Sequence, residues 1–283
     1  MRFVSWQKNG MTGLAVRQGT NLFPLEGMDL LSVLRGGLLT NKAHTEPLDQ
    51  SGLTYLPPIA NPPKIICVGM NYKDHAQENK LESQDHPTFF VRFASSLIGH
   101  EQPIIRPRVS EQLDFEGELA AIIGKPGRHI PKEQALEHVA GYSIFNDASI
   151  RDYQMRGKQW TLGKNFDATG PFGPEFVTAD ELPPGAKGLR LTTRLNGEVM
   201  QSANTDDLIF DVATLIADLS EAMTLETGDV IVTGTPGGIG FFRNPKVYMK
   251  PGDVCEIEIE GIGTLRNRIQ DEAQAVSRQG AAK

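Results

Sequence analysis

The sequence lacks several features that would place it in a specialised class of proteins. It has only 2 cysteines in 283 residues, so it is not a disulfide-rich secreted scaffold. It has no run of about 18 consecutive apolar residues, which a membrane-spanning helix needs. Its first residues also lack the charged-then-apolar build of a signal peptide. We therefore expect a cytoplasmic protein that does not enter a membrane.

The two cysteines, Cys67 and Cys255, are far apart in the sequence, and each lies in an apolar run. Their spacing matches neither a zinc knuckle nor a redox pair, which excludes metal binding through sulfur. We predict two buried free thiols in a reducing compartment, with a disulfide between them as the alternative.

An excess of positive charge is also missing. The chain has 28 Lys and Arg against 35 Asp and Glu, a formal net charge of -7. Nucleic acid binding needs clustered Lys and Arg, so we expect no nucleic-acid partner. Hydrophobic residues make up 39% and charged residues 22%, as in ordinary globular proteins, and the length is enough for a proper core.

Short apolar segments recur after residue 64, and most of them contain β-branched or aromatic residues. They lie at 64–69, 88–93, 117–123, 138–145, 189–195, 229–233 and 254–259. Helical periodicity is clear only at 211–223, around 132–138 and shortly after Asn71. Because strands and helices do not alternate strictly, we predict a β-rich α+β fold rather than a doubly wound parallel sheet.

Residues 1–61 are predicted to form a small N-terminal domain. They open with two strand-like runs, 1–6 and 13–17, and continue with an apolar helical stretch at 28–34. Prolines at positions 57, 58, 62 and 63 then punctuate the chain just before a buried-strand signal. This cluster marks the start of the main body at residue 62.

Three carboxylates flank two of the predicted strands. Glu116 and Glu118 are two residues apart, so strand geometry points both side chains to one face. Asp147 follows another apolar run, where a loop can present a ligand. Three oxygen ligands suit Mg²⁺, Mn²⁺ or Ca²⁺ and leave positions open for substrate and water. The alternative is a set of solvated acids that bind no metal.

His75 and Glu78 are three residues apart in a predicted helix and would share one of its faces. A carboxylate in that position can orient and polarise the imidazole of a general base. The alternative is a surface pair that contributes little.

Further polar residues follow Asp147 in a loop-rich stretch. Arg151, with Gln154 beside it, can hold a carboxylate through two N–H groups, and Lys164 can stabilise an enolate. The glycine-rich run 232–240 fits neither the Walker nor the dinucleotide pattern. We interpret it as a tight turn whose backbone amides and Thr235 hydroxyl face a substrate. Arg151 and Lys164 can equally be solvated surface charges.

Six short motifs, taken in their order along the chain, resemble the fumarylacetoacetate hydrolase (FAH) family. They are the helix from His75 to Glu78, Glu116-Gly117-Glu118, Asn146-Asp147, Lys164-Asn165-Phe166-Asp167, Gly234-Thr235-Pro236 and Glu258–Asn267. The resemblance covers a catalytic domain at 62–270 and leaves 271–283 as a C-terminal tail. One departure is Arg92, which stands where many members have lysine.

The resemblance implies a mixed β-sandwich or β-roll core, usually in a homodimer. It makes Glu116, Glu118 and Asp147 the ligands of Mg²⁺ or Mn²⁺. The resemblance also implies that His75 with Glu78 lies on a mobile lid and activates water, while Lys164 and the metal stabilise an enolate. Substrate oxygens would be held by Arg151, Gln154 and Thr235.

The main functional hypothesis is a metal-dependent hydrolase of the acylpyruvate or fumarylpyruvate type, which cleaves a carbon–carbon bond of a small 2,4-dioxo acid in the breakdown of aromatic compounds. The alternative is an oxaloacetate decarboxylase or a related keto–enol isomerase or lyase, which uses the same metal and enolate without an attacking water. A third possibility is a catalytically silent module that binds a metabolite or a partner. In the first two cases the partner is a small anionic 2-oxo acid.

Overall fold

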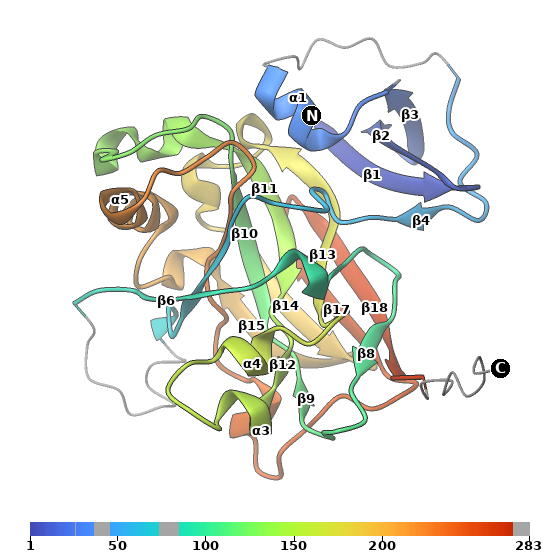
Figure 1. Cartoon of the computed structure of the whole chain (residues 1–283), viewed down its shortest axis with the longest axis vertical. Coiled ribbons are helices and arrows are strands. Elements are labelled where there is room, and N and C mark those ends of the chain that lie inside the picture. The colour runs from blue at the N-terminus through green and yellow to red at the C-terminus, as the bar shows by residue number, and fades with distance from the viewer. Residues whose placement is uncertain (26, 37–45, 74–84, 274–283) are drawn as a thin grey trace, which may run out of the picture.

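The computed structural model describes residues 1–25, 27–36, 46–73 and 85–273. They form three β-sheets with short helices around them (Figure 1). The strands are β1 (Arg2–Lys8), β2 (Met11–Gln18), β3 (Asn21–Leu25), β4 (Thr54–Tyr55), β5 (Ile65–Gly69), β6 (Thr88–Val91), β7 (Leu97–Ile98), β8 (Ile104–Arg106), β9 (Leu113–Asp114), β10 (Gly117–Ile123), β11 (Val139–Asn146), β12 (Ser149–Ile150), β13 (Gly170–Thr178), β14 (Arg190–Leu195), β15 (Glu198–Asn204), β16 (Val230–Val232), β17 (Val254–Ile259) and β18 (Gly263–Asp271).

The helices of the described residues are short. The α-helices are α1 (Leu30–Gly36), α3 (Arg151–Gln154), α4 (Thr161–Lys164) and α5 (Val212–Ala222). The 3₁₀ helices are η1 (Ala94–Ser96), η2 (Lys132–His138), η3 (Ala179–Glu181), η4 (Pro184–Ala186), η5 (Thr205–Asp207) and η6 (Gly240–Phe242). Within these residues, no helix has the length and apolar character needed to span a membrane.

The largest sheet has the strand order β3-β2-β1-β13-β11-β10-β16-β5-β6. In addition, β4 pairs with β1, and β7 pairs with β13. Strand β10 lies inside it, antiparallel to both β11 and β16. All of its residues are buried, because alternate side chains enter two different cores. Leu119 and Ala121 enter one core, and Ala120 and Ile122 enter the other. This burial on both faces explains the unbroken apolar run in the sequence.

The five-stranded sheet β15-β14-β17-β18-β8 packs against one face of the large sheet. The core between them combines Leu119 and Ile144 of the large sheet with Leu191, Ile257 and Leu265 of the smaller one. Inward-facing residues alternate with outward-facing ones along β17, as sheet packing requires. The predicted β-rich α+β fold with a mixed sandwich core is therefore confirmed.

Helix α5 closes one end of this core. Its buried residues Leu215, Ile216 and Leu219 recur with helical spacing and belong to the same core as both sheets. Asp211 caps its first turn by accepting a hydrogen bond from the backbone N–H of Thr214 at 2.9 Å. The sequence predicted this helix at 211–223.

The N-terminal strands extend the large sheet through β1, which pairs with β13 and places Phe3 opposite Phe176. Two salt bridges reinforce this contact: the buried Glu175 accepts hydrogen bonds from Arg2, at 2.7 Å, and from Arg17. Figure 1 shows β1, β2 and β3 beside α1 at one end of the molecule. The division of the chain after residues 61 and 270 stays a prediction.

Other predictions can be compared directly with the structure. The segments 117–123 and 254–259 coincide with β10 and β17. The stretch 132–138 forms a 3₁₀ helix instead of an α-helix, in keeping with its role as a seven-residue connector into β11. The two cysteines are free and buried, as expected. The predicted helix after Asn71 lies mostly outside the described residues.

Candidate metal centre and active site

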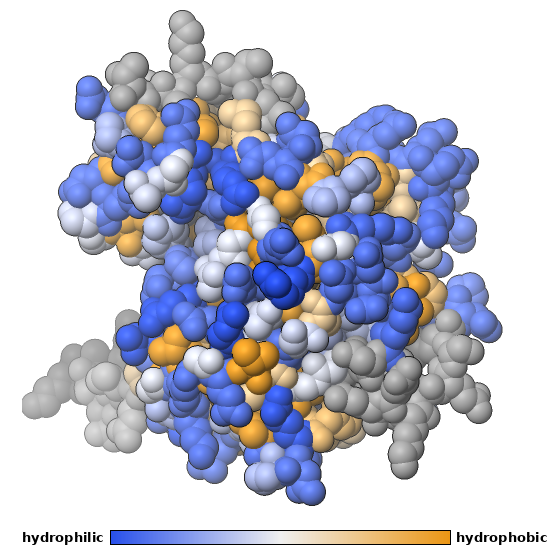
Figure 2. Space-filling view, turned by 180° about the vertical axis from the view of Figure 1, so that it is seen from behind, coloured by the Kyte–Doolittle hydropathy of each residue, from blue (hydrophilic) through white to orange (hydrophobic). Residues whose placement is uncertain are grey.

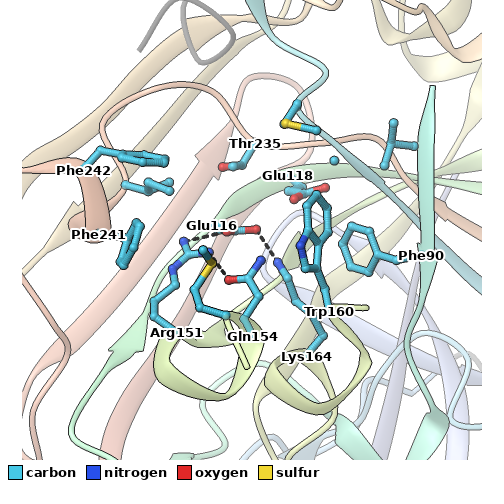
Figure 3. A pocket seen from close by; sticks show the side chains of 15 residues that line it. Phe90, Glu116, Glu118, Arg151, Gln154, Trp160, Lys164, Thr235, Phe241 and Phe242 are labelled. Carbon is cyan, nitrogen blue, oxygen red and sulfur yellow. Dashed lines mark hydrogen bonds and ion pairs between the residues drawn. The ribbon is translucent and has the colours of Figure 1, made fainter. Parts of the chain in front are cut away.

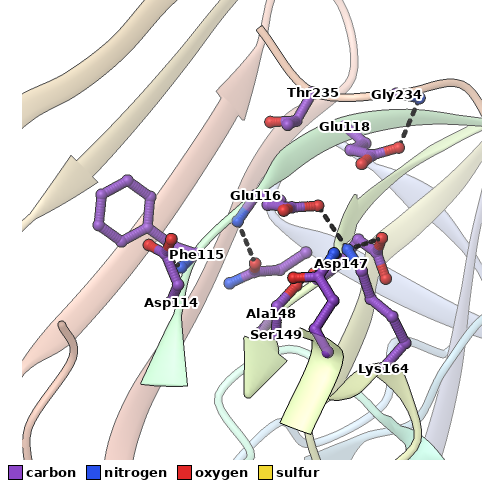
Figure 4. A network of polar contacts seen from close by, with 12 residues as sticks. Asp114, Phe115, Glu116, Glu118, Asp147, Ala148, Ser149, Lys164, Gly234 and Thr235 are labelled. Carbon is purple, nitrogen blue, oxygen red and sulfur yellow. Dashed lines mark hydrogen bonds and ion pairs between the residues drawn. The ribbon is translucent and has the colours of Figure 1, made fainter. Parts of the chain in front are cut away.

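Two paired strands bring the three predicted carboxylates together. Gly117 of β10 pairs with Asn146 of β11, and the next residue, Asp147, donates its backbone N–H to the carbonyl of Glu116 at 2.9 Å. One oxygen each of Glu116, Glu118 and Asp147 lies within 4.8 Å of the others, and all three residues are buried (Figure 4). Strand pairing thus supplies the proximity of Asp147 that the sequence left open.

The electrostatics of this cluster fit a divalent cation. Burial, together with the charges of Asp147 and Glu116, raises the pKa of Glu118 well above its ordinary value. A cation between the three carboxylates would remove this repulsion. The donors are hard carboxylate oxygens, which suit Mg²⁺ or Mn²⁺. The residues present therefore fit the predicted metal centre, although they do not distinguish these two ions.

Lys164, on α4, contacts two of the three carboxylates. Its Nζ lies 2.7 Å from Oε2 of Glu116 and 2.6 Å from Oδ2 of Asp147, and its side chain is buried. Burial alone would lower the pKa of Lys164, but the charges of Asp147 and Glu116 outweigh it, and the pKa is raised. The ammonium is therefore charged at neutral pH and donates hydrogen bonds to both carboxylates.

Arg151 lies at the other oxygen of Glu116. Its Nη2 is 2.6 Å from Oε1 of Glu116, and its Nη1 donates to the side-chain oxygen of Gln154 at 2.8 Å. Its Nε and Nη2 both lie 2.8 Å from one oxygen of Asp114. These contacts fix the plane of the guanidinium at the edge of the cavity.

Asp114 connects this arginine to the loop after β16. Its carboxylate accepts hydrogen bonds from the backbone N–H groups of Gly240 and Phe241, both at 2.9 Å. Burial, the largest influence, raises the pKa of Asp114, while Arg151 opposes the shift. The sequence analysis did not single out Asp114, although it lies two residues before Glu116 in the same acidic run.

Arg92 has a different role from that of a substrate contact. It is buried, and its Nη1 lies 2.6 Å from Oδ1 of Asp147, whereas Lys164 holds the other oxygen. Its Nη2 donates to the hydroxyl of Thr169 at 3.0 Å. Arg92 therefore orients a candidate metal ligand.

A cavity of about 270 Å³ opens beside these groups. Figure 3 shows Phe241 and Phe242 on one side of it, Trp160 and Phe90 on the opposite side, and Glu116 between them. The lining residues are Val68, Gly69, Met70, Phe90, Glu116, Glu118, Arg151, Gln154, Met155, Trp160, Lys164, Thr235, Ile239, Phe241 and Phe242. Small-molecule sites are usually lined by aromatic and other apolar side chains together with a few charged or polar groups, and this cavity has that composition.

Six of the predicted site residues line this cavity, and Asp147 adjoins it. The six are Glu116, Glu118, Arg151, Gln154, Lys164 and Thr235. The Thr235 hydroxyl donates to the carbonyl of Gly117 at 3.0 Å, so it also holds its own turn against β10. The predicted pair His75 and Glu78 lies outside the described residues. The catalytic and binding roles of all these residues stay predictions.

The sequence analysis missed the aromatic walls. Phe90, Trp160, Phe241 and Phe242 come from three separate segments, and no spacing rule connects them. Rarity singles out Trp160 alone, since the chain has 2 tryptophans but 13 phenylalanines.

The chain is similar to known proteins over most of its length. The chain is 44% identical over 246 residues to the Homo sapiens protein named oxaloacetate tautomerase FAHD2A, mitochondrial, covering 86% of this chain and 77% of that protein. A solved fumarylacetoacetate hydrolase from Exiguobacterium antarcticum is 38% identical, with a TM-score of 0.84, and covers 96% of this chain and 100% of its own.

A second solved structure, a 2-hydroxyhepta-2,4-diene-1,7-dioate isomerase from Mycobacterium marinum, is 31% identical with a TM-score of 0.80 and covers 97% of this chain and 100% of its own. Residues 64–270 match the family described as Fumarylacetoacetate (FAA) hydrolase C-terminal. That match spans most of the chain and contains every described candidate residue of the metal centre. The chain therefore belongs to the fumarylacetoacetate hydrolase family.

Proposed function

We propose that this chain is a divalent-metal-dependent enzyme that interconverts the keto and enol forms of a small 2-oxo acid, with oxaloacetate as the substrate. Curated relatives named oxaloacetate tautomerase support this choice, at 44% identity over 86% of the chain for the Homo sapiens protein and 40% over 95% for the Xenopus laevis protein. This proposal favours the keto–enol alternative of the sequence analysis over acylpyruvate hydrolysis.

One observation carries the proposal: a charged, buried lysine points into the carboxylate cluster on the floor of a small cavity. Lys164 donates to Glu116 and Asp147 at 2.7 and 2.6 Å. A 2-oxo acid bound over this floor would bring its carbonyl oxygen near the ammonium. An ammonium in a dry site stabilises the negative charge of an enolate far better than water does.

The residues around Lys164 complete the arrangement. Glu116, Glu118 and Asp147 would hold Mg²⁺ or Mn²⁺, and the cation would supply Lewis-acid polarisation of the 2-oxo group. Arg151 and Gln154, already fixed in position, would hold a substrate carboxylate. These contacts would hold the acid in one orientation over the carboxylate floor.

The reaction moves one proton from the enol hydroxyl to the third carbon, and nothing is added or lost. No attacking water is needed, so the task of the site is to stabilise the enolate and to return a proton to carbon. We assign the proton transfer to His75, oriented by Glu78, on the basis of the sequence pattern alone.

Hydrolysis of an acylpyruvate is the second candidate. The solved relative named fumarylacetoacetate hydrolase favours it, and its departing 2-oxo acid needs the same enolate stabilisation at Lys164. His75→Ala should abolish hydrolysis, because that reaction depends on an activated water. The variant should also slow tautomerisation, because His75 is the residue assigned to the proton transfer. The choice of substrate and the product, rather than this variant, therefore separate the two candidates.

A parallel assay tests the proposal. Protein loaded with Mn²⁺ or Mg²⁺, and a chelated control, would receive enol oxaloacetate in one reaction and an acylpyruvate in another. We expect metal-dependent decay of the enol ultraviolet absorbance without release of carbon dioxide. Release of pyruvate and a carboxylic acid from the acylpyruvate, with oxaloacetate tautomerising no faster than in buffer, would replace the proposal with hydrolysis.

Location and assembly also stay proposals. The Homo sapiens and Xenopus laevis relatives carry the word mitochondrial in their names, whereas the sequence analysis predicts a cytoplasmic protein. A homodimer remains the expected assembly from family resemblance. Fractionation of the source cells and light scattering of the purified protein would test these two predictions.

A further inference from the structure

One wall of the cavity consists of an indole ring that lies directly on a glycine. A Cβ atom placed on Gly69 would lie only 2.4 Å from Cζ3 and 2.7 Å from Cη2 of Trp160. Real Cβ atoms do not approach other atoms so closely, so the ring occupies the space that any side chain at position 69 would need. Gly69 ends β5 without a left-handed conformation, so space is what this position requires.

A second aromatic ring packs against the indole, and both are connected to Lys164. The Phe90 ring meets it edge to face, with centroids 5.3 Å apart and planes at 72°. The Trp160 carbonyl accepts the backbone N–H of Lys164 at 3.2 Å, and Nζ of Lys164 lies 5.0 Å from the Phe90 ring centre. The wall and the lysine on the floor therefore form one packed unit (Figure 3).

The opposite wall is less enclosed. Phe242 is 43% exposed, and its neighbour Phe241 is anchored through its backbone by Asp114. The space between the walls, about 270 Å³, is below the roughly 300–1,000 Å³ typical of sites for drug-sized ligands. A four-carbon acid over the carboxylate floor needs only part of this space, whereas an aryl tail directed at this wall would meet a ring that is seated on Gly69 and packed on Phe90.

We propose that Trp160, seated on Gly69, sets the upper size limit of the substrate: it admits short 2-oxo acids such as oxaloacetate and excludes 2,4-dioxo acids with an aryl tail. This inference rests on the proposed function, because it assumes that a 2-oxo acid binds over the carboxylate floor. Trp160 acts by occupying space and takes no part in the proton transfer.

Four variants test this proposal. Trp160→Ala removes the wall, and Trp160→Leu is the backup if the alanine variant does not fold. Gly69→Ala should push the indole into the cavity, and the double variant Gly69→Ala/Trp160→Ala should relieve that clash. Phe242→Ala is the matched control, since it removes a lining aromatic ring from the more exposed wall.

The first readout is binding, which does not depend on turnover. Mn²⁺-loaded protein would be titrated calorimetrically with oxalate, a small enolate mimic, and with benzoylpyruvate, an aryl 2,4-dioxo acid. For Trp160→Ala we expect benzoylpyruvate to bind at least about tenfold more tightly, since a single methylene already changes affinity about 10–200-fold in an apolar pocket. Oxalate affinity should change less than about threefold, because oxalate does not reach the wall.

The second readout is oxaloacetate tautomerisation. Gly69→Ala should raise KM, and the double variant should return it toward the wild-type value. Unchanged benzoylpyruvate binding in both Trp160 variants, with oxalate binding intact, would overturn the inference. An equal gain in Phe242→Ala would overturn it as well, because the limit would then not belong to Trp160.

The two proposals fail in different ways. If the wild-type protein binds oxalate but leaves oxaloacetate untouched, the proposed function is wrong, and the binding series still decides the size limit. If the protein tautomerises oxaloacetate while Trp160→Ala gains no affinity for benzoylpyruvate, only the size limit is wrong.

Discussion

Two clusters of buried charge in this protein use the same residue types for different ends. At the cavity, the carboxyl groups of Asp114, Glu116, Glu118 and Asp147 lie among three buried cations, so four carboxyl groups meet three positive charges. At the contact between the N-terminal strands and β13, the buried carboxylate of Glu175 meets Arg2 and Arg17, and Arg2 also pairs with Glu181.

The two clusters differ in how well their charged groups are matched, and this difference distinguishes a candidate binding site from a structural contact. At the contact between the N-terminal strands and β13, Glu175 and Glu181 balance the two arginines, and both arginines reach solvent, with side chains 31% and 23% exposed. At the cavity, the carboxyl groups outnumber the cations by one, and Glu116 and Glu118 line a space that a ligand can enter. Buried charge that is not matched by its neighbours is costly, and such sites are commonly functional.

The largest expected effect comes from Glu118→Gln, which removes one candidate ligand and the excess carboxyl group together. We expect Mn²⁺ affinity and tautomerase activity to fall by more than the roughly 10–100-fold that changes around a metal ligand cost. Calorimetric titration with Mn²⁺ checks affinity, and melting without metal checks folding. Wild-type Mn²⁺ affinity in this variant would show that the carboxylate cluster is not the metal centre.

Lys164→Met should separate catalysis from metal binding. We expect kcat to fall about 10²–10³-fold, the usual cost of one group that stabilises a developing oxyanion. Mn²⁺ affinity should hold or rise, since the ammonium that contacts Glu116 and Asp147 no longer opposes the cation. A lost affinity with unchanged kcat would mean that the lysine only organises the carboxylates.

Glu175→Ala tests the structural cluster. We expect the free energy of unfolding to fall by about 1–3 kcal/mol, the cost of leaving charged hydrogen-bonding groups without their partner, and kcat and KM to stay unchanged. Urea unfolding and steady-state kinetics on one preparation measure both. A changed KM with unchanged stability would remove the distinction between the two clusters.

Asp211→Asn should have the smallest effect, and it depends on pH. Burial would raise the pKa of Asp211, but hydrogen bonds from Thr214 and the nearby Lys187 and Lys132 hold it below the model-peptide value of 3.8. A depressed pKa stabilises the fold above pH 3.8, and this contribution is lost as pH falls further. The variant should be less stable than wild type by under about 1 kcal/mol at pH 7, and the gap should narrow below pH 4. A difference in stability that widens in acid would contradict a lowered pKa of Asp211.

Part of this site could be predicted from sequence because its signal is local. Glu116 and Glu118 are two residues apart on one strand, and Asp147 follows the adjacent strand, so alternation and strand ends were enough to suggest a shared site. The strands β10 and β17 were equally accessible, since their apolar patterns reflect burial directly.

The rest depends on contacts between distant segments. Asp114 bonds to Gly240 and Phe241, more than a hundred residues away, and Trp160 packs on Gly69 from a different part of the fold. No periodicity or spacing in one sequence encodes such contacts. Arg92 is a further example. The sequence showed that an arginine stands where many family members have lysine, but its ion pair with Asp147 could be seen only in the structure.

The most direct test of the central claim is a titration of metal-free protein with Mn²⁺ in which metal occupancy and oxaloacetate tautomerisation are followed together. Our account predicts that the rate rises in proportion to occupancy of one site per chain in the wild-type protein, and that Glu118→Gln shows neither the site nor the rate. A tautomerisation rate that is already at its maximum without metal, or that is absent when the site is full, would contradict it.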